Sequence, residues 1–508
     1  MRYALTGGQM REVDRRTIRE IGIPSMVLME RAAYALVEEI RGELRPSDRI
    51  LVACGTGNNG ADGVAAARML ALLGYGPAVV IGGDEERGSE EFKAQLSIAR
   101  NLDIPVFEAE DFIPGRCDVL IDAVFGVGLS RPLSGSYREF VQMLSELSPR
   151  LTAAVDVPTG IHSDSGQIMG MALKADVTVT FGYEKLGCLL YPGKEYCGRL
   201  VRADIGFPEK ALDMGKAAGE AYASFLTFED LKTIPPRLPD ANKGTYGKVL
   251  IAAGSKGMSG AAYFSALAAY RTGAGLCRIF TDEANRPALQ QLIPEAVITS
   301  YDGGAAADDA GGFSDAVERA VREATVVVLG PGLGRSQRSR LLVKTILEQA
   351  FVPVVLDADG LNLVAENPQF TDYFTENIIV TPHVGEMARL TGLTAEAIKA
   401  DPVKAARDYA AAHGVTCVLK DAATVVADRD GRVFVNRSGC GAMAKAGSGD
   451  VLSGVIGGLL ALGMSETEAA AMGVYLHGRA GEQAAKISGG HGLLAREICS
   501  YLAKEMET

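Results

Sequence analysis

Three loops in the first half of the chain place glycines, amides and carboxylates directly after apolar, strand-like runs. They are Gly55-Thr-Gly-Asn-Asn-Gly-Ala-Asp-Gly63, Asp122-Ala-Val-Phe-Gly-Val-Gly-Leu-Ser-Arg-Pro132 and Asp156-Val-Pro-Thr-Gly-Ile-His-Ser-Asp-Ser-Gly166. Because parallel α/β sheets gather ligands at the carboxyl ends of their strands, we expect the three loops to form one site. Asn59, Asp122 and Thr159 supply hard oxygen atoms, which suit an alkali or alkaline-earth cation better than zinc.

The first of these loops also satisfies the dinucleotide fingerprint G-x-G-x-x-G, through Gly55, Gly57 and Gly60. Asp84 follows at about the distance of a ribose contact, so a dehydrogenase is one interpretation and a purely structural turn is another. Against the dehydrogenase, two asparagines and Asp62 fill a turn that such enzymes line with small apolar side chains. An aspartate after a strand can also be a simple loop cap.

The second half carries the strongest single motif, Ala446-Gly-Ser-Gly-Asp450. Small residues leave backbone N–H groups free to converge on a phosphate at a helix N-terminus, and Asp450 begins that helix. An N-cap role would explain the aspartate, but not the small residues before it. No G-x-x-x-x-G-K-[ST] sequence occurs, which excludes P-loop chemistry.

Five further polar or glycine-bearing loops accompany this motif. They are Gly254–Ala262, Leu329–Arg335, Leu356–Asn362, Thr381–Glu386 and Val418–Thr424. Of the five histidines, His383 follows a strand and lies near Glu386, which favours a functional role. The other four form no catalytic or metal-binding spacing, and we expect them to pack or to lie on the surface.

Strand-like apolar runs alternate with helical patterns along most of the chain, which predicts mainly parallel sheets that position these loops. The strands expected are 50–54, 78–81, 119–121, 153–155 and 177–181 in the first half, and 248–252, 325–329, 352–356, 377–380 and 416–419 in the second. The helices expected include 25–43, 61–73, 260–272 and 448–462. Pro235, Pro236 and Pro239 predict a stiff extended linker between two domains. We expect a first domain at 1–217, a linker at 218–240 and a second domain at 241–508.

Composition narrows the classes of function. Fifty-one Lys and Arg against 63 Asp and Glu give a net charge of −12 without a basic patch, which argues against nucleic acid and anionic membranes as partners. Eight scattered cysteines favour free thiols over a disulfide scaffold or a zinc site. The N-terminus lacks a signal peptide, and the longest apolar stretch, 451–464, is shorter than the ~20 residues of a membrane span. A cytoplasmic protein is therefore predicted, and we expect a homo-oligomer.

The loops of the first half resemble the N-terminal domain of the bifunctional NAD(P)H-hydrate repair enzymes, a Rossmann-like three-layer NAD(P)H-hydrate epimerase. The resemblance implies that Asp156 is the acid/base and contacts the substrate. Potassium would be held by Asn59, Asp122 and Thr159. The hydrate's cleft would be lined by Asn58, Asn59, Gly60, Ala61, Asp62, Gly126, Val127, Gly128, Leu129, Ser130, Arg131 and Pro132.

From about Lys243 onward the chain resembles the ribokinase-like fold, and more closely the C-terminal ADP-dependent (S)-NAD(P)H-hydrate dehydratase domain of the same family. The implied co-substrate is ADP, with Mg²⁺, and Asp450 would deprotonate the 6-hydroxyl of the hydrate. The implied hydrate contacts are Ala261, Gly334, His383 and Asp450. The implied nucleotide contacts are Lys420, Asp421, Ala422, Ala423, Thr424 and Gly449.

The second domain departs from the family pattern at Asp421, Cys440, Gly441, Ala442 and Lys445. One hypothesis is that Asp421 and Lys445 face each other as a compensating pair. An altered nucleotide preference is the alternative. The enzymatic runner-up for the whole chain is a ribokinase-like small-molecule kinase, such as a vitamin kinase, fused to a Rossmann-like domain. The non-enzymatic alternative is a nucleotide-binding scaffold.

Overall fold

The computed structural model of the chain describes residues 1–303 and 310–507. Residues 304–309 and 508, which fall in the expected second domain, lie outside the described residues. The chain divides into two compact units. Residues 3–223 form one, here the N-terminal unit, and residues 1–2 and 224–508 form the other, the C-terminal unit.

The N-terminal unit is built on a seven-stranded parallel sheet with the strand order β4-β3-β2-β5-β6-β7-β9. The strands are β2 (Ile50–Cys54), β3 (Pro77–Ile81), β4 (Val106–Glu108), β5 (Val119–Ala123), β6 (Leu151–Val155), β7 (Val177–Phe181) and β9 (Arg199–Ala203). Outside this seven-stranded sheet, β1 (Arg2–Leu5) pairs in parallel with β8 (Glu184–Lys185).

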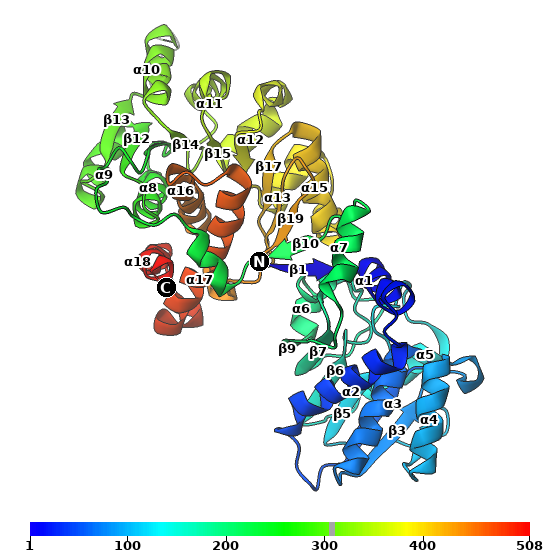
Figure 1. Cartoon of the computed structure of the whole chain (residues 1–508). Helices are drawn as coiled ribbons and strands as arrows, with labels where there is room; N and C mark the ends of the chain where they lie inside the picture. Colours follow the sequence, from blue (N-terminus) through cyan, green and yellow to red (C-terminus); the bar gives the residue numbers. More distant parts are fainter. Residues whose placement is uncertain (304–309, 508) are drawn as a thin grey trace. The chain divides into compact units, whose positions relative to one another are not determined.

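Helices cover both faces of this sheet, as the blue and cyan ribbons of Figure 1 show. On β2, Val52 and Cys54 enter the core beneath α2, α3 and α4, whereas Leu51 and Ala53 enter the core beneath α5. This alternation is the two-residue period of a strand buried on both sides. The helices are α1 (Gly7–Arg15), α2 (Ser25–Arg41), α3 (Asn58–Leu72), α4 (Glu90–Asn101), α5 (Gly135–Ser145), α6 (Gly193–Tyr196) and α7 (Glu209–Ala217), with helical turns at Arg16–Ile21, Glu85–Arg87 and Leu186–Cys188.

The sheet of the C-terminal unit has the order β13-β12-β11-β14-β15-β16-β17-β18-β19-β10. It is parallel from β13 to β17, whereas β18 runs antiparallel to both of its neighbours. The strands are β10 (Ala223–Phe225), β11 (Lys248–Ala252), β12 (Leu276–Asp282), β13 (Val297–Tyr301), β14 (Val326–Leu329), β15 (Val354–Leu356), β16 (Ile378–Val380), β17 (Thr416–Leu419), β18 (Val425–Ala427) and β19 (Val433–Val435).

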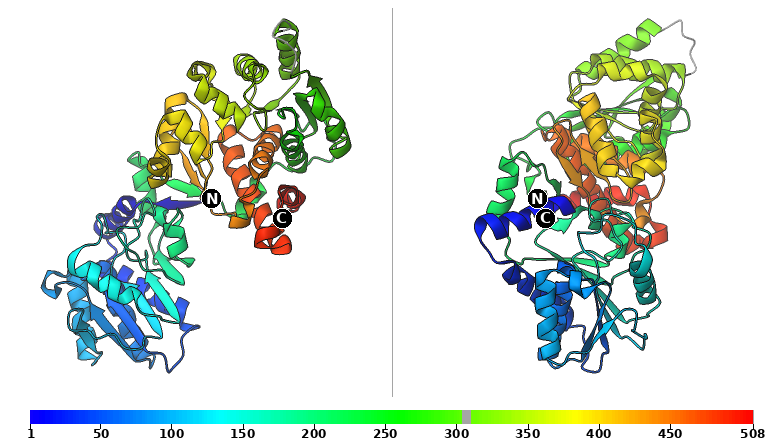
Figure 2. Two further views of the ribbon diagram at one scale, coloured as in Figure 1. Left: turned by 180° about the vertical axis from the view of Figure 1, so that it is seen from behind. Right: turned by 90° about the vertical axis from the view of Figure 1, so that its right-hand side faces the viewer.

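The helices α8, α16, α17 and α18 share one large apolar core with these strands, and α10, α11 and α12 lie across the sheet from them (Figures 1 and 2). The helices are α8 (Ser259–Arg271), α9 (Arg286–Leu292), α10 (Ala310–Arg322), α11 (Gln337–Gln349), α12 (Asp359–Glu366), α13 (Val384–Thr391), α14 (Ala395–Ala400), α15 (Pro402–His413), α16 (Ser448–Ala461), α17 (Glu466–Gly492) and α18 (Ala495–Met506). Helical turns lie at Phe228–Thr233, Glu283–Asn285, Pro368–Tyr373 and Gly441–Met443.

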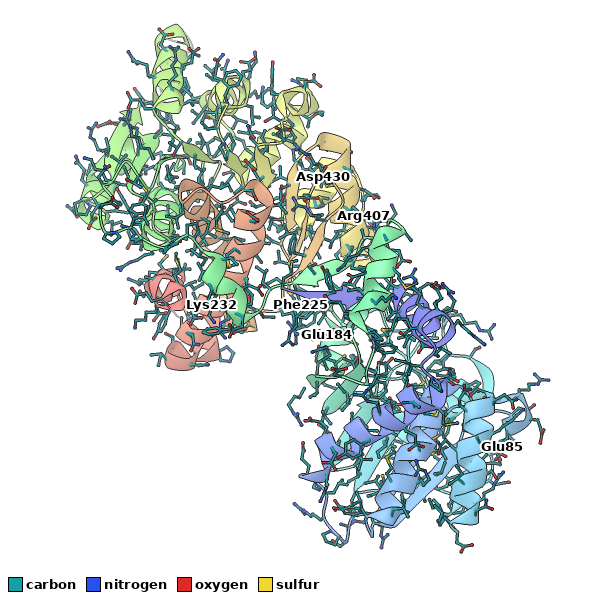
Figure 3. The ribbon with its side chains drawn as sticks, viewed as in Figure 1. Glu85, Glu184, Phe225, Lys232, Arg407 and Asp430 are labelled. Atoms are coloured by element: carbon teal, nitrogen blue, oxygen red, sulfur yellow. The ribbon has the colours of Figure 1, made fainter. Side chains whose placement is uncertain are left out.

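The segment before the three prolines packs into the C-terminal unit. Phe225, labelled in Figure 3, is 1% exposed and lies beneath the guanidinium of Arg437, whose carbon is 4.8 Å from the ring centroid. Leu231 and Ile234 join the core of the same unit. The predicted α/β class with mainly parallel sheets is confirmed in both units. None of the helices in the described ranges combines the length and hydropathy that a bilayer span requires.

Candidate active sites

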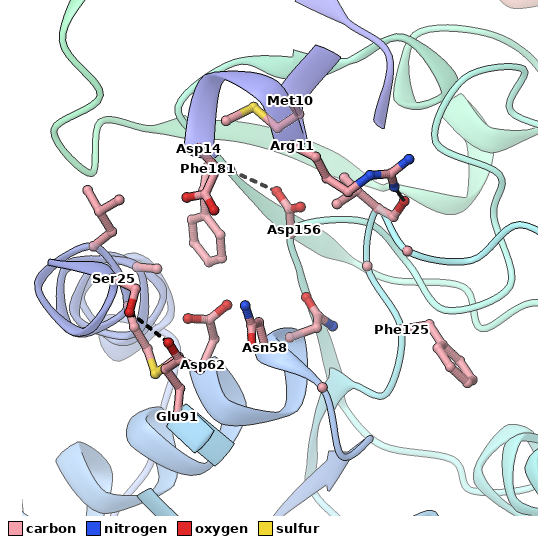
Figure 4. Close-up of a pocket in the computed structure, with 18 of the residues that line it drawn as sticks. Met10, Arg11, Asp14, Ser25, Asn58, Asp62, Glu91, Phe125, Asp156 and Phe181 are labelled. Carbon is pink, nitrogen blue, oxygen red and sulfur yellow. Dashed lines mark hydrogen bonds between the residues drawn. The ribbon is translucent and has the colours of Figure 1, made fainter. Parts of the chain in front are cut away.

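The three loops of the N-terminal unit meet at the carboxyl edge of the sheet and enclose a cavity of about 470 Å³ (Figure 4). Helices α1 and α2 contribute the opposite wall, with apolar side chains such as Met10, Leu28 and Met29. The sequence-predicted residues that line the cavity are Asn58, Asn59, Asp62, Gly126, Val127, Gly128 and Asp156. Of the remainder, Gly60, Ala61 and Leu129 are buried, and Ser130, Arg131 and Pro132 are exposed on the following loop.

Asp156 is held by three donors on one of its carboxylate oxygens. Its Oδ1 accepts from the Lys185 Nζ at 2.5 Å, from the Phe181 N–H at 3.0 Å and from the Thr180 hydroxyl at 3.1 Å. Lys185 is only 1% exposed, so its ammonium depends on this carboxylate for a counter-charge. The Asp156 backbone has a φ of 67°, the left-handed region that L-residues rarely adopt. The arrangement fixes the Asp156 carboxylate at the cavity wall.

Asp122 is a fully buried carboxylate without a basic partner among the described residues. It accepts from the Thr159 hydroxyl at 2.6 Å and the Thr159 N–H at 2.8 Å, and burial raises its pKa to about 6. Asn59 lies against the loop that follows β5, since its Oδ1 is 2.7 Å from the point where a Cβ on Gly126 would stand. The structure thus joins two of the three predicted cation ligands, Asp122 and Thr159, at a carboxylate that lacks a counter-charge, and it places Asn59 against the loop after Asp122. Their donor set fits a potassium ion.

The C-terminal unit places a buried polar network under the N-terminus of α16. The Lys420 Nζ donates to Asp357 Oδ1 at 2.7 Å, and the Ser453 hydroxyl donates to Asp357 Oδ2 at 2.6 Å. Burial alone would raise the pKa of Asp357, but the Lys420 charge and the hydrogen bonds from Lys420, Ser453 and Thr381 together outweigh it, and the pKa is lowered. Ala358, the next residue, has a φ of 50°. The turn between β15 and α12 is therefore strained where it delivers this carboxylate.

Asp450 lies in the first turn of α16, next to this network. Burial, followed by the charge of Asp357, raises its pKa to about 6. Gly449 brings the helix backbone close to the network, because a Cβ there would be 3.5 Å from the Lys420 Nζ. The site therefore combines a poised carboxylate, a lysine and free helix N–H groups, the set that phosphoryl chemistry requires.

The other predicted hydrate contacts surround the same edge of the sheet. The Gly334 N–H donates to Asp359 at 2.8 Å, and Ala261 faces Gly332, where a Cβ would be 2.8 Å from its own. His383 caps α13, since its Nδ1 accepts from the Gly385 N–H at 2.9 Å. His383 is also bridged through its backbone to Lys420, which connects it with the network.

The other predicted nucleotide contacts and the departures from the family pattern lie outside the buried network around Asp357 and Lys420. Asp421 and Ala422 are exposed, whereas Ala423 and Thr424 are buried. No ion pair joins Asp421 to Lys445 within the described part of the unit, so the compensating pair is not found. The Lys445 ammonium instead donates to the His491 carbonyl at 2.9 Å, near the end of α17.

Sequence reasoning missed several members of both sites. Each of the missed residues depends on a partner far away in the sequence. Lys185 donates to Asp156, 29 residues away, Lys420 donates to Asp357, 63 residues away, and Ser453 donates to Asp357, 96 residues away. His477 on α17 is buried with its Nε2 3.4 Å from the Ser448 hydroxyl, and burial lowers its pKa to about 4. The only signal available for Asp357 was its place after an apolar strand. His477 gave none.

Replacing Asp357 with Asn should destabilise the C-terminal unit by up to about 3 kcal/mol, because it removes the nearest counter-charge of the largely buried Lys420 and leaves only Glu386, 4.0 Å away, as its ion-pair partner. Thermal and urea unfolding would measure the change. The matched control is Glu348→Gln, which breaks the surface pair of Lys344 and Glu348 at 3.5 Å. The control should cost about 0–1 kcal/mol. Equal effects of the two variants would contradict the buried-pair assignment.

Two family models match the chain, one for each unit. Residues 25–187 match the YjeF-related protein N-terminus, and residues 249–504 match NAD(P)H-hydrate dehydratase. A bifunctional NAD(P)H-hydrate repair enzyme of Thermofilum pendens is 36% identical over 98% of this chain and 95% of its own length. The chain belongs to the bifunctional NAD(P)H-hydrate repair enzymes.

Other members of this repair family also align along nearly the whole chain. The repair enzyme of Moorella thermoacetica is 36% identical over 98% of this chain and 96% of its own, and that of Escherichia coli is 31% identical over 97% and 92%. Among solved structures, an ADP/ATP-dependent NAD(P)H-hydrate dehydratase from Bacillus subtilis is 31% identical, with a TM-score of 0.48 over 56% of this chain and 98% of that one. The family predicted from the loops is therefore confirmed.

Proposed function

We propose that the chain repairs hydrated NAD(P)H in two steps, one in each unit. The N-terminal unit interconverts the R and S epimers, and the C-terminal unit dehydrates the S form to NAD(P)H while ADP becomes AMP and phosphate. The observation that carries this proposal is the full-length match to the family together with a carboxylate in each site, the buried Asp156 and the half-buried Asp450. A ribokinase-like vitamin kinase would leave the cavity around Asp156 without a purpose.

The N-terminal step inverts carbon 6 of the reduced nicotinamide. The ring nitrogen helps the C6–O bond to break, so the departing hydroxyl needs a proton and the returning water needs a base. Asp156 suits the base, because three donors hold its Oδ1 in place and its Oδ2 accepts no hydrogen bond from the described residues. The apolar wall of α1 and α2 would exclude bulk water from the cationic ring. Asn59, Asp122 and Thr159 would hold potassium, whose charge would neutralise the buried carboxylate of Asp122.

In the C-terminal step Asp450 would remove the proton of the 6-hydroxyl, whose oxygen then attacks the terminal phosphorus of ADP and releases AMP. Elimination breaks the C6–O bond, releases phosphate and, with loss of a proton from C5, restores the double bond. The backbone amides of Gly447–Gly449 and the Lys420 ammonium would bind the phosphoryl oxygens. Mg²⁺ on the ADP phosphates would neutralise further charge. Ala261, Gly334 and His383 would contact the hydrate, and Lys420–Thr424 with Gly449 would contact the nucleotide.

One experiment tests both activities. The purified chain is given a mixture of R- and S-hydrated NADH, with or without ADP, Mg²⁺ and potassium, and reduced-nicotinamide absorbance is followed. We expect full recovery of absorbance only with ADP, one phosphate released per NADH, and consumption of both epimers. Formation of a stable phosphorylated product without NADH would support the kinase alternative, and no turnover would support the scaffold.

A further inference from the structure

The N-terminal cavity contains a second inward-facing carboxyl group, Asp62, whose role the base function of Asp156 leaves unexplained. Asp62 lies near the start of α3, and Asp156 follows β6, so the two carboxyls reach the cavity from different loops. Figure 4 shows them on different sides of the space between α1, α2 and the sheet edge. A ligand bound in this cavity therefore has one carboxyl on each side.

The surroundings of the two carboxyls differ sharply. Asp156 has the Lys185 ammonium and two further donors, whereas Asp62 has no hydrogen bond or ion pair within the part of the chain that the structure describes. The titratable groups that line the cavity around Asp62 are Arg11 and Asp14 on α1, Glu91 on α4, Tyr137 on α5, Asp156 and Lys185. Arg11 donates to the Val127 carbonyl at 3.0 Å, and the Lys185 ammonium donates to Asp156. Neither cation forms an ion pair with Asp62 among the described residues.

This environment favours the neutral form of Asp62. Burial, followed by the negative charges of Asp156 and Asp14, raises its pKa well above the usual carboxyl range, and Lys185 offsets only part of the shift. Two carboxyls in one site with opposite protonation are the usual arrangement for an acid and a base that act together. Burial, followed by the charge of Glu91, also raises the pKa of Asp14. Asp14 is therefore the alternative proton donor in this cavity.

We propose that Asp62 is the general acid of the epimerisation and acts opposite Asp156. This inference rests on the proposed function of the N-terminal unit. The Asp62 carboxyl donates its proton to the 6-hydroxyl, the C6–O bond breaks with its electron pair on oxygen, and water departs as the ring nitrogen forms the iminium. Water then adds to C6 from the other face, and Asp156 takes its proton. Proton exchange with solvent returns both carboxyls to their starting states, so no oxidant or reductant is needed.

The test is Asp62→Asn, which keeps the size of the side chain and removes its acidic proton. We expect the kcat of R/S interconversion to fall at least about 100-fold, the typical contribution of a general acid, with KM changed less than threefold. Incorporation of ¹⁸O at C6 from labelled water should fall equally. The matched control is Glu139→Gln on the exposed surface of α5, which should retain the wild-type rate.

A second variant and a pH profile separate catalysis from folding. Asp62→Glu, which restores an acidic proton, should recover at least a tenth of the wild-type kcat. The wild-type kcat/KM should fall as pH rises through the raised pKa of Asp62, and Asp62→Asn should lose that limb. A kcat within tenfold of wild type in Asp62→Asn, or loss of interconversion in Asp14→Asn alone, would overturn the inference. A wild-type chain that interconverts no epimers would instead overturn the proposed function, and this inference with it.

Discussion

Replacing Asp450 with Asn should lower ADP-dependent dehydration about 10³-fold, within the range expected for loss of a general base. The amide keeps the shape of the side chain at the start of α16 but cannot take the proton of the 6-hydroxyl. Regained reduced-nicotinamide absorbance and released phosphate measure the loss. Interconversion of the R and S hydrates in the same molecule should continue at the wild-type rate, because it depends on the other unit.

Asp450 also predicts the pH dependence of the wild-type reaction. Its pKa is raised to about 6 by burial and then by Asp357, and it must be ionised to act as a base. The kcat/KM of dehydration should therefore rise with pH up to about 6 and level off above it. Asp430→Asn, at the exposed turn after β18 (Figure 3), is the matched control and should keep this profile. Rapid dehydration by Asp450→Asn would show that another group removes the proton.

Replacing Asp156 with Asn should abolish R/S interconversion, again by about 10³-fold, while hydrate binding persists. Asn adopts the left-handed backbone conformation more readily than most residues, so the φ of 67° is preserved. The amide oxygen can still accept from Lys185, but the buried ammonium loses its counter-charge, so the N-terminal unit should also lose stability and the rates are compared below its melting temperature. Chromatographic separation of the epimers measures the rate, and tritiated hydrate measures binding.

Dehydration of pure S hydrate with ADP is the internal control and should be unchanged in Asp156→Asn. With the R hydrate as the sole substrate, the variant should regain reduced nicotinamide far more slowly than wild type. Full interconversion in this variant would remove Asp156 from the mechanism and leave its strained backbone without a catalytic explanation.

The order of elements and the composition of both loop clusters could be predicted from the sequence. Strands such as Ile50–Cys54, Val177–Phe181 and Thr416–Leu419 match the expected bounds, because their apolar runs end in polar or glycine-bearing loops. The strands β1, β4, β8, β9, β10, β12 and β13 were not predicted, and neither were β18 and β19, which run antiparallel to each other. Both are three residues long, too short for a period to emerge.

Charge partnership was the part that could not be predicted. Lys185 and Asp156 are 29 residues apart, and the lysine reaches the carboxylate from β8, where its ammonium also donates to the Phe181 carbonyl at the end of β7. No ion pair joins Asp421 to Lys445 among the described residues, and the Lys445 ammonium donates to a backbone carbonyl on α17. Residue types at strand ends predict where a site lies, but the counter-charge of each group depends on the tertiary fold.

The left-handed backbone of Asp156 is a strain that a heat-resistance screen would not remove. Glycine would relax this conformation, which costs an ordinary L-residue about 1 kcal/mol, but it would leave the 1% exposed Lys185 ammonium without its counter-charge. Breaking such a buried pair costs about 3 kcal/mol, so the glycine variant should melt at a lower temperature than wild type. Engineering of this chain for durability should therefore keep the strained aspartate and seek stabilising substitutions at other positions.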